Sequence, residues 1–111
     1  MNKYLAIYVA PVEGIDQMMK TMTPEQGKAD MESWTRWMDS KGDAFLDKGA
    51  PLGKTKRATP GKVDDARNGI CGYSIVQAES HEAAADIFKD SPHFGLAGSY
   101  VEVLAIMPMS A

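Results

Sequence analysis

The first strand-like segment, Lys3–Ala10, is apolar on both of its faces, and this feature most constrains what the chain can fold into. Alternate residues of a strand point to opposite sides of its sheet. The two sets here are Tyr4, Ala6, Tyr8 and Ala10 on one side, and Leu5, Ile7 and Val9 on the other. The segments Gly69–Ala78 and Tyr100–Met107 alternate in the same two-sided way. Strands of this kind are covered on both faces, so the sequence predicts a sheet between two layers.

Two helices are predicted between these strands. Thr23-Pro24-Glu25-Gln26 has the form of a capping box, with Thr23 as the cap and Pro24 in the first turn. This helix is expected to run to about Lys48 and to end at Gly49. Its apolar stripe consists of Met31, Trp34, Met38 and Phe45, with Trp37 beside it. A shorter helix is expected after Ser80, with the stripe Ala83, Ala84, Ile87 and Phe88.

The order of elements predicts an α+β fold. Residues 11–22 are expected to hold one helical turn or to form a flap, Leu52–Thr59 a cationic edge strand, and Pro60–Asn68 a loop. The order is then strand, long helix, strand, strand, short helix, strand. With right-handed crossovers this is the ferredoxin-like βαββαβ plait, a four-stranded antiparallel sheet with two helices on one face.

The face of the sheet without helices predicts a partner. Two helices cover only one face, yet the strands are apolar on both. A second copy of the chain is the simplest cover, so we expect a homodimer through the open sheet face. A length of 111 residues predicts one domain over residues 1–111.

The composition excludes several classes of protein. Hydrophobic residues make up 44% of the chain, which excludes a disordered protein, and the net charge of −3 argues against nucleic-acid binding. No stretch approaches the roughly 20 apolar residues of a membrane span. The single cysteine, Cys71, excludes an internal disulfide framework and favours a reducing compartment, so a cytoplasmic protein is expected.

Several motifs together resemble the YCII-related (DGPF) family. They are Lys3–Tyr8, Gly53-Lys54, the block Gly72–Ser80, Ala83-Ala84-Ala85, Asp90-Ser91-Pro92-His93 and Val101-Glu102-Val103. The resemblance spans nearly the whole chain and implies a dimeric α+β barrel, in which two ferredoxin-like sheets face each other. Members of the family are broadly of unknown function, and some resemble small-molecule enzymes with a His and Asp pair in the pocket. In this chain both members of the pair are absent. The segment that matches the Asp reads Ala10-Pro11-Val12, and the segment that matches the His reads Ser33-Trp34-Thr35. The Asp-Gly-Pro-Phe (DGPF) signature is also absent, and that region reads Val63-Asp64-Asp65-Ala66.

His93 is the candidate catalytic residue. An imidazole can act as acid or base near neutral pH, or ligate a metal. The alternative is that His93 packs at the helix–strand corner or the dimer seam with Phe94. His81, in the first turn of a helix, is expected to be solvated. No metal-ligand spacing is found, and neither a metal nor a cofactor is predicted.

The candidate ligand pocket consists of Tyr8, Trp34, Met38 and Tyr73. Such side chains suit a flat organic ligand, although Trp34 and Met38 fit a core stripe equally well. Tyr8 and Tyr73 are expected to share a sheet face if their strands pair in register. Cys71 is expected to be a small buried hydrophobe. The cations Lys54, Lys56 and Arg57 could attract an anionic ligand or could simply be solvated on an edge strand.

Two functions remain nearly equal. The first is a small-molecule enzyme of the dimeric α+β barrel type that acts on a small organic compound, with His93 as acid or base and with Tyr8 and Tyr73 holding the ligand. The second is a non-catalytic ligand-binding or accessory protein, which the missing His and Asp pair favours. A third possible function is a purely structural dimer with no small-molecule role. The fold alone does not decide among them.

Overall fold

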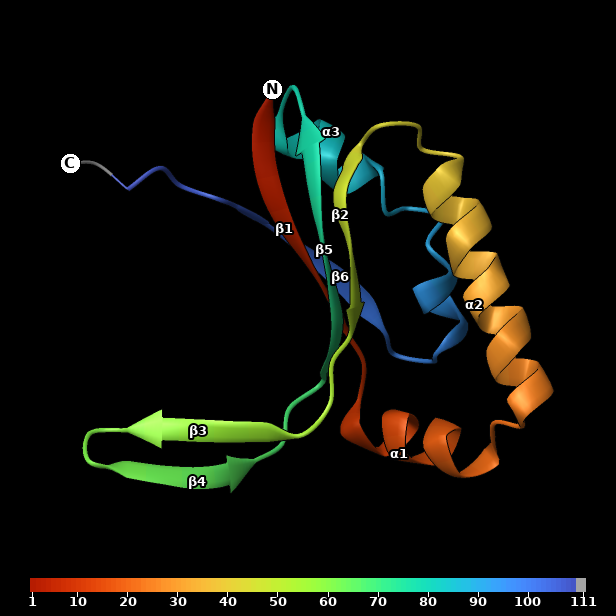
Figure 1. Ribbon diagram of the computed structural model, residues 1–111, viewed down its shortest axis with the longest axis vertical. Helices are drawn as coiled ribbons and strands as arrows, with labels where there is room; N and C mark the ends of the chain where they lie inside the picture. The colour runs from red at the N-terminus through yellow and green to blue at the C-terminus, as the bar shows by residue number, and fades with distance from the viewer. Residues whose placement is uncertain (110–111) are drawn as a thin grey trace.

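The computed structural model describes residues 1–109 and contains a four-stranded antiparallel sheet with the order β2–β5–β1–β6 (Figure 1). Its strands are β1 (Asn2–Val9), β2 (Phe45–Pro51), β5 (Ile70–Ala78) and β6 (Tyr100–Ala105). The helices are α1 (Val12–Thr21), α2 (Pro24–Asp39), α3 (His81–Asp86) and the 3₁₀ turn η1 (Pro92–Gly95). Strands β3 (Thr55–Thr59) and β4 (Lys62–Ala66) form a separate hairpin.

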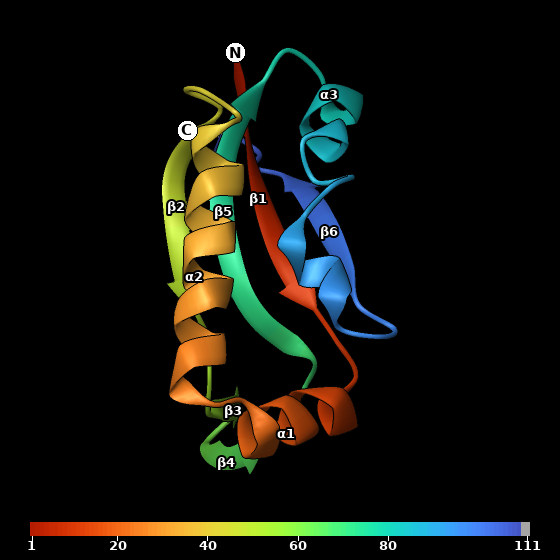
Figure 2. The ribbon, with the colours of Figure 1, turned by 90° about the vertical axis from the view of Figure 1, so that its right-hand side faces the viewer.

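The arrangement is the ferredoxin-like plait that the sequence predicted. Every neighbouring pair in the four-stranded sheet is antiparallel, and the two long strands β1 and β5 lie at its centre. The helices α2 and α3 and the turn η1 lie on one side of the sheet, while α1 runs across its end (Figure 2). None of the helices in residues 1–109 is long and apolar enough to cross a membrane.

The core lies between the sheet and its helices. It contains Tyr4, Ala6, Tyr8, Trp37, Met38, Val76, Ala78, Ala84 and Phe88. The strand residues of this set alternate with others that point to the opposite face. That opposite face carries Leu5, Ile7, Val9, Tyr73 and Ile75, all of them half-buried in the single chain. The prediction that both sides of β1 and β5 are apolar is therefore confirmed.

Helix α2 begins where predicted but ends earlier. The Thr23 hydroxyl accepts the Gln26 N–H at 3.1 Å, and the Gln26 side chain accepts the Thr23 N–H at 2.9 Å, which completes the capping box. The predicted end near Lys48 is wrong, because α2 stops at Asp39 and Gly42 adopts the left-handed φ of +64° in the turn that follows. Phe45 thus opens β2 instead of extending the helical stripe.

Gly49 lies in a strand, so its predicted role as a helix cap is wrong. It has a φ of +80° inside β2, where the pairing with β5 is irregular. A Cβ atom at this position would lie 1.6 Å from the carbonyl oxygen of Tyr73. The Asp47 carboxylate accepts the Gly49 N–H at 2.8 Å. Gly49 therefore permits a bulge at which β2 keeps close contact with β5.

Two further expectations between the main strands are wrong. The segment 11–22 forms the ten-residue helix α1 instead of a single turn or flap. The expected edge strand 52–59 and loop 60–68 form the β3–β4 hairpin outside the main sheet, whose edge strands are β2 and β6. Opposite charges face each other across the hairpin at Lys56 and Asp65, a pairing that favours this register.

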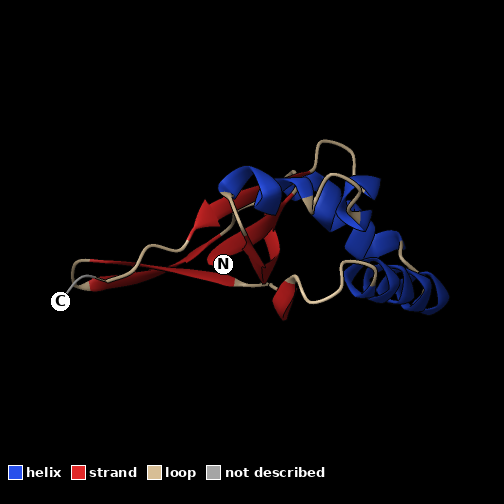
Figure 3. Cartoon of the chain, turned by 90° about the horizontal axis from the view of Figure 1, so that it is seen from above, coloured by secondary structure: helices blue, strands red, loops and turns tan. Residues whose placement is uncertain are grey.

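The molecule is concave on the side opposite its helices. The β3–β4 hairpin and the segment that follows β6 both project from the open face of the sheet (Figures 1 and 3). The radius of gyration is 15.5 Å. A compact domain of this length has a radius of gyration of about 13 Å. The hairpin and the segment that follows β6 thus border the open face at two of its ends.

Candidate functional site

His93 is held in η1 by local hydrogen bonds. The Ser91 hydroxyl accepts the backbone N–H of His93 at 3.2 Å, and the Ser99 hydroxyl donates to the His93 carbonyl at 3.0 Å. Pro92 fixes the first position of the turn. The residue is only 4% exposed. The imidazole is therefore a positioned group and not a mobile surface side chain.

The hydrogen bonds of the imidazole fix which nitrogen carries its proton. The Nε2 atom lies 2.7 Å from the carbonyl oxygen of Val9. A carbonyl only accepts, so Nε2 donates, and in the neutral ring Nδ1 holds the lone pair. Within residues 1–109 every fully buried side-chain nitrogen or oxygen has a hydrogen-bond partner. The Nδ1 atom of His93 has none there. The Nδ1 atom is therefore not fully buried, although the residue as a whole is.

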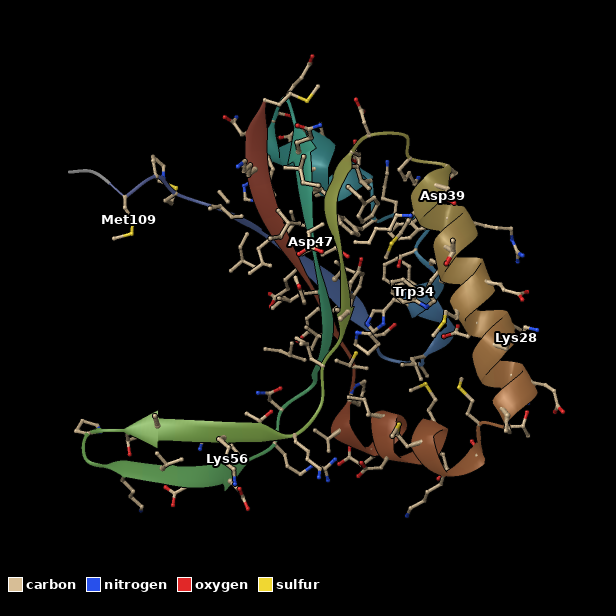
Figure 4. The ribbon with its side chains drawn as sticks, in the orientation of Figure 1. Lys28, Trp34, Asp39, Asp47, Lys56 and Met109 are labelled. Carbon is tan, nitrogen blue, oxygen red and sulfur yellow. The ribbon has the colours of Figure 1, made fainter. Side chains whose placement is uncertain are left out.

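Aromatic rings surround this histidine. The Tyr8 ring meets His93 edge-to-face at 5.5 Å between centroids, and Trp34 lies 6.3 Å from it. The planes of Tyr8 and Trp34 are nearly perpendicular at 4.8 Å. Trp34 lies between α2 and the sheet (Figure 4). The three rings come from β1, α2 and η1, so tertiary packing assembles this group.

The Tyr8 hydroxyl is part of a buried chain of hydrogen bonds. Its oxygen lies 2.8 Å from the Ser74 hydroxyl, which in turn donates to the Lys48 carbonyl at 2.8 Å. Since Ser74 has one proton and gives it to Lys48, the Tyr8 hydroxyl donates to Ser74. Burial raises the pKa of Tyr8 to about 12. Tyr8 is therefore neutral at physiological pH and offers a ligand only its ring and oxygen lone pairs.

The structure brings together three of the predicted site residues, His93, Tyr8 and Trp34. Met38 is buried in the core, which is the alternative that its helical spacing allowed. Tyr73 lies on the other face, and the expectation that it shares a face with Tyr8 is wrong. The register pairs Tyr8 with Gly72, so side-chain alternation turns Tyr73 away from the helices.

Tyr73 has a different environment on the open face. Its hydroxyl donates to the Asp47 carboxylate at 3.2 Å. This hydrogen bond and the negative charge of Asp47 raise the pKa of Tyr73. The same carboxylate accepts the Gly49 N–H, so Asp47 already has two donors.

Sequence reasoning missed Asp90 and Ser74. Asp90 accepts the Trp37 indole N–H at 2.9 Å and the Lys41 ammonium at 2.9 Å, and these bonds, the indole first, lower its pKa. The bonds tie the end of α2 to the segment just before Pro92. Ser74 was detectable in principle, because a hydroxyl in the middle of an apolar strand requires a buried partner.

The remaining titratable candidates lie outside this group. The Cys71 thiol donates to the Tyr8 carbonyl at 3.3 Å, and burial raises its pKa. Cys71 is half-buried and packs against the core cluster. His81 is exposed as expected, although it stacks on Tyr4 and its Nε2 lies 2.7 Å from the Val103 carbonyl oxygen. Within residues 1–109 no three His, Cys, Asp or Glu side chains are grouped as metal ligands.

Comparison with known proteins supports the fold. No family model matches the chain, and no curated protein is significantly similar to it. One similar solved structure is 5-chloro-2-hydroxyhydroquinone dehydrochlorinase from Burkholderia phenoliruptrix AC1100, in complex with 2,5-dihydroxybenzoquinone. The sequences are 14% identical, the TM-score is 0.51, and the similarity covers 90% of each chain. The likeness supports the ferredoxin-like fold of this chain.

Proposed function

We propose that this single-domain chain is a small-molecule enzyme of the dimeric α+β barrel type, in which His93 transfers a proton to or from a small, flat organic compound. The observation that carries the proposal is the orientation of His93. Its Nε2–H is engaged by the Val9 carbonyl, so Nδ1 is the ring nitrogen left to exchange a proton, and the imidazole packs against Tyr8 and Trp34. Imidazole is the side chain best suited to proton transfer near neutral pH.

The surroundings of His93 support the role of a base. When Nδ1 takes a proton, Nε2 keeps its 2.7 Å hydrogen bond to the Val9 carbonyl, so the transfer breaks no existing hydrogen bond of the ring. The bond also prevents the ring from turning. Tyr8 and Trp34 form an aromatic wall beside His93 that suits a planar ligand, and Met38 packs in the core.

The substrate class follows from the same aromatic group. A small-molecule site is mostly apolar with a few placed polar groups, as here. The structurally similar dehydrochlorinase binds 2,5-dihydroxybenzoquinone, a small flat ring. We extend the proposal to an oxygenated ring compound of this size and to membership of the YCII-related family, on the sequence motifs quoted above.

A non-catalytic ligand-binding or accessory protein is the second candidate. The observation that favours it is that, within residues 1–109, the His93 imidazole has no carboxylate or second imidazole as a hydrogen-bond partner. Within residues 1–109 its only ring hydrogen bond goes to a backbone carbonyl. A binding protein would use the same aromatic walls and would need no proton transfer.

Exchange of ring hydrogens for deuterium in 2,5-dihydroxybenzoquinone, followed by NMR, separates the two candidates. A deuteron adds to a ring carbon and the original proton then leaves from the same carbon, so one imidazole can act first as acid and then as base, without net change in the compound. We expect the wild-type protein to accelerate exchange about tenfold or more over buffer, as general bases do. His93→Gln, which keeps a donor for Val9, should return the rate to that of buffer. Binding without acceleration would establish the second candidate, and no binding would exclude this ligand class.

The proposed assembly is a homodimer through the open sheet face in a reducing, cytoplasmic setting. The half-buried apolar residues on that face would become buried against a second copy, and Asp47 already has the donors that a buried carboxylate needs. Facing sheets lie about 10 Å apart, whereas a five-residue strand spans roughly 17 Å. Each hairpin would therefore pass alongside the sheet of the other copy.

A further inference from the structure

A pocket of about 110 Å³ lies where the β3–β4 hairpin leaves the body of the protein. The connection from β2 to β3 forms one wall through Leu52 and Lys54, and the connection from β4 to β5 forms another through Arg67 and Asn68. Ile15 of α1 and Cys71 of β5 close it. The pocket shares no lining residue with the aromatic group around His93, so it is a separate feature of the chain.

The charge of this pocket is positive. Its lining includes the cations Lys54 and Arg67 and no carboxylate. Both terminal nitrogens of the Arg67 guanidinium donate to Asp16, which is outside the lining, at 3.1 Å for Nη1–Oδ2 and 2.5 Å for Nη2–Oδ1. This contact lowers the pKa of Asp16, so the carboxylate is ionised and neutralises part of the Arg67 charge. Lys54 is not part of an ion pair within residues 1–109.

The backbone at Lys54 is strained. Its φ is +31°, and it is the one residue other than glycine with a positive φ in residues 1–109. An L-residue with a side chain is disfavoured in this region, where glycine is the usual choice. Glycine is already present at the preceding position, Gly53. Backbone strain of this kind clusters at ligand sites, and here it lies at a residue whose side chain adds a cation to a pocket.

The rest of the lining determines what kind of anion fits. Leu52 and Ile15 are apolar and offer contact to a hydrocarbon body, while Asn68 adds a polar edge. Burial raises the pKa of the Cys71 thiol, so sulfur is present without negative charge and does not repel an anion. A fully inorganic anion would leave the apolar wall unused.

We infer that this pocket binds the carboxylate of a small organic acid, with Lys54 and Arg67 holding the carboxylate and the apolar wall contacting its carbon chain. The inference is independent of proton transfer at His93. An acid bound here would also brace the base of the hairpin against α1, because its two cations come from the two connections that carry the hairpin.

Titration of the folded protein with butyrate, followed by NMR, tests the inference without any enzyme assay. Butyrate is aliphatic, so it is a poor ligand for the aromatic group. We expect butyrate to shift the amide signals of residues 52–55 and 67–71 saturably. Its neutral isostere butyramide should not do so. Equal binding of butyramide, or binding of inorganic phosphate without binding of butyrate, would overturn the inference.

Charge variants make the test specific. Lys54→Gln should weaken butyrate binding about fivefold, the upper range for one exposed ion pair, while Lys54→Arg should retain it. Asp16→Asn should strengthen binding, because it frees Arg67 from its competing carboxylate. Lys56→Gln is the matched control, since Lys56 pairs with Asp65 on the hairpin and does not line the pocket. Equal loss in the Lys54 and Lys56 variants would show a diffuse charge effect and contradict the assignment.

Discussion

The imidazole Nε2 of His93 donates a hydrogen bond to the carbonyl oxygen of Val9 at 2.7 Å, across a separation of 84 residues. This bond joins the turn after α3 to the last residue of β1. It explains how a histidine on a short turn becomes a fixed group. It also leaves Nδ1 as the nitrogen that can exchange protons with a ligand.

The stability of the protein should fall between about pH 10 and 12 because of Tyr8. Its pKa is about 12 in the folded protein and near 10 when unfolded. In this range the unfolded chain loses a proton that the folded protein retains, so the free energy of unfolding decreases as pH rises, by up to about 3 kcal/mol. Urea unfolding at pH 9 and at pH 11.5 measures this decrease.

Tyr8→Phe is the control for that prediction. It removes the titrating hydroxyl and one hydrogen bond to Ser74, so it should cost about 1 kcal/mol at pH 9. The further loss up to pH 11.5 should be smaller than in the wild type. An identical loss in both proteins would mean that other groups cause it.

The open face of the sheet should hold the proposed homodimer. Ile75 is half-buried at the centre of that face, opposite Leu5 of β1. We expect the wild type to sediment at twice the chain mass of 12.1 kDa and Ile75→Lys to sediment as a monomer, because a lysine there would be buried without a partner. Met31→Lys, on an exposed site of α2, should remain a dimer. A monomeric wild type, or a dimeric Ile75→Lys, would contradict this assembly.

Gly49→Ala should disrupt the β2–β5 pairing. The added methyl group would lie 1.6 Å from the Tyr73 carbonyl oxygen, so the strands must separate locally. We expect a loss of about 3 kcal/mol or more in urea unfolding. Gly42→Ala is the matched comparison, since Gly42 also has a positive φ but its added Cβ meets no atom within 4 Å. That variant should lose only about 1 kcal/mol.

Lys54→Gly should stabilise the protein while it weakens the proposed carboxylate binding, as Lys54→Gln does. Glycine removes the steric strain at a φ of +31°, a gain of about 1 kcal/mol before the larger entropy of the unfolded glycine is counted. Differential scanning calorimetry should show a small rise in Tm. A lower Tm would mean that the Lys54 side chain stabilises the fold through contacts rather than binding a ligand at a cost in stability.

Much of the fold was predictable from local signals. The two-sided alternation in β1 and β5 and the capping box at Thr23 predicted the plait and its open face. The end of α2 was not predictable, because the apolar spacing from Met38 to Phe45 fits both a helix and a turn followed by a strand. Gly42 decides between them through a conformation that only the folded chain reveals.

The candidate site was predictable only in part. His93, Tyr8 and Trp34 were identified by residue type, and packing brings them together. The sheet register was not available from the sequence, and a shift of one residue places Tyr73 on the other face. The role of Ser74 depends on the Lys48 carbonyl, which a bulged strand presents only after folding.

The ¹⁵N chemical shifts of the His93 ring test the central claim most directly. The account predicts the Nε2–H tautomer in the neutral ring, with an unprotonated Nδ1 whose signal moves when 2,5-dihydroxybenzoquinone is added. A proton on Nδ1 in the neutral ring, or an Nδ1 signal unchanged by a ligand that binds elsewhere on the protein, would contradict it.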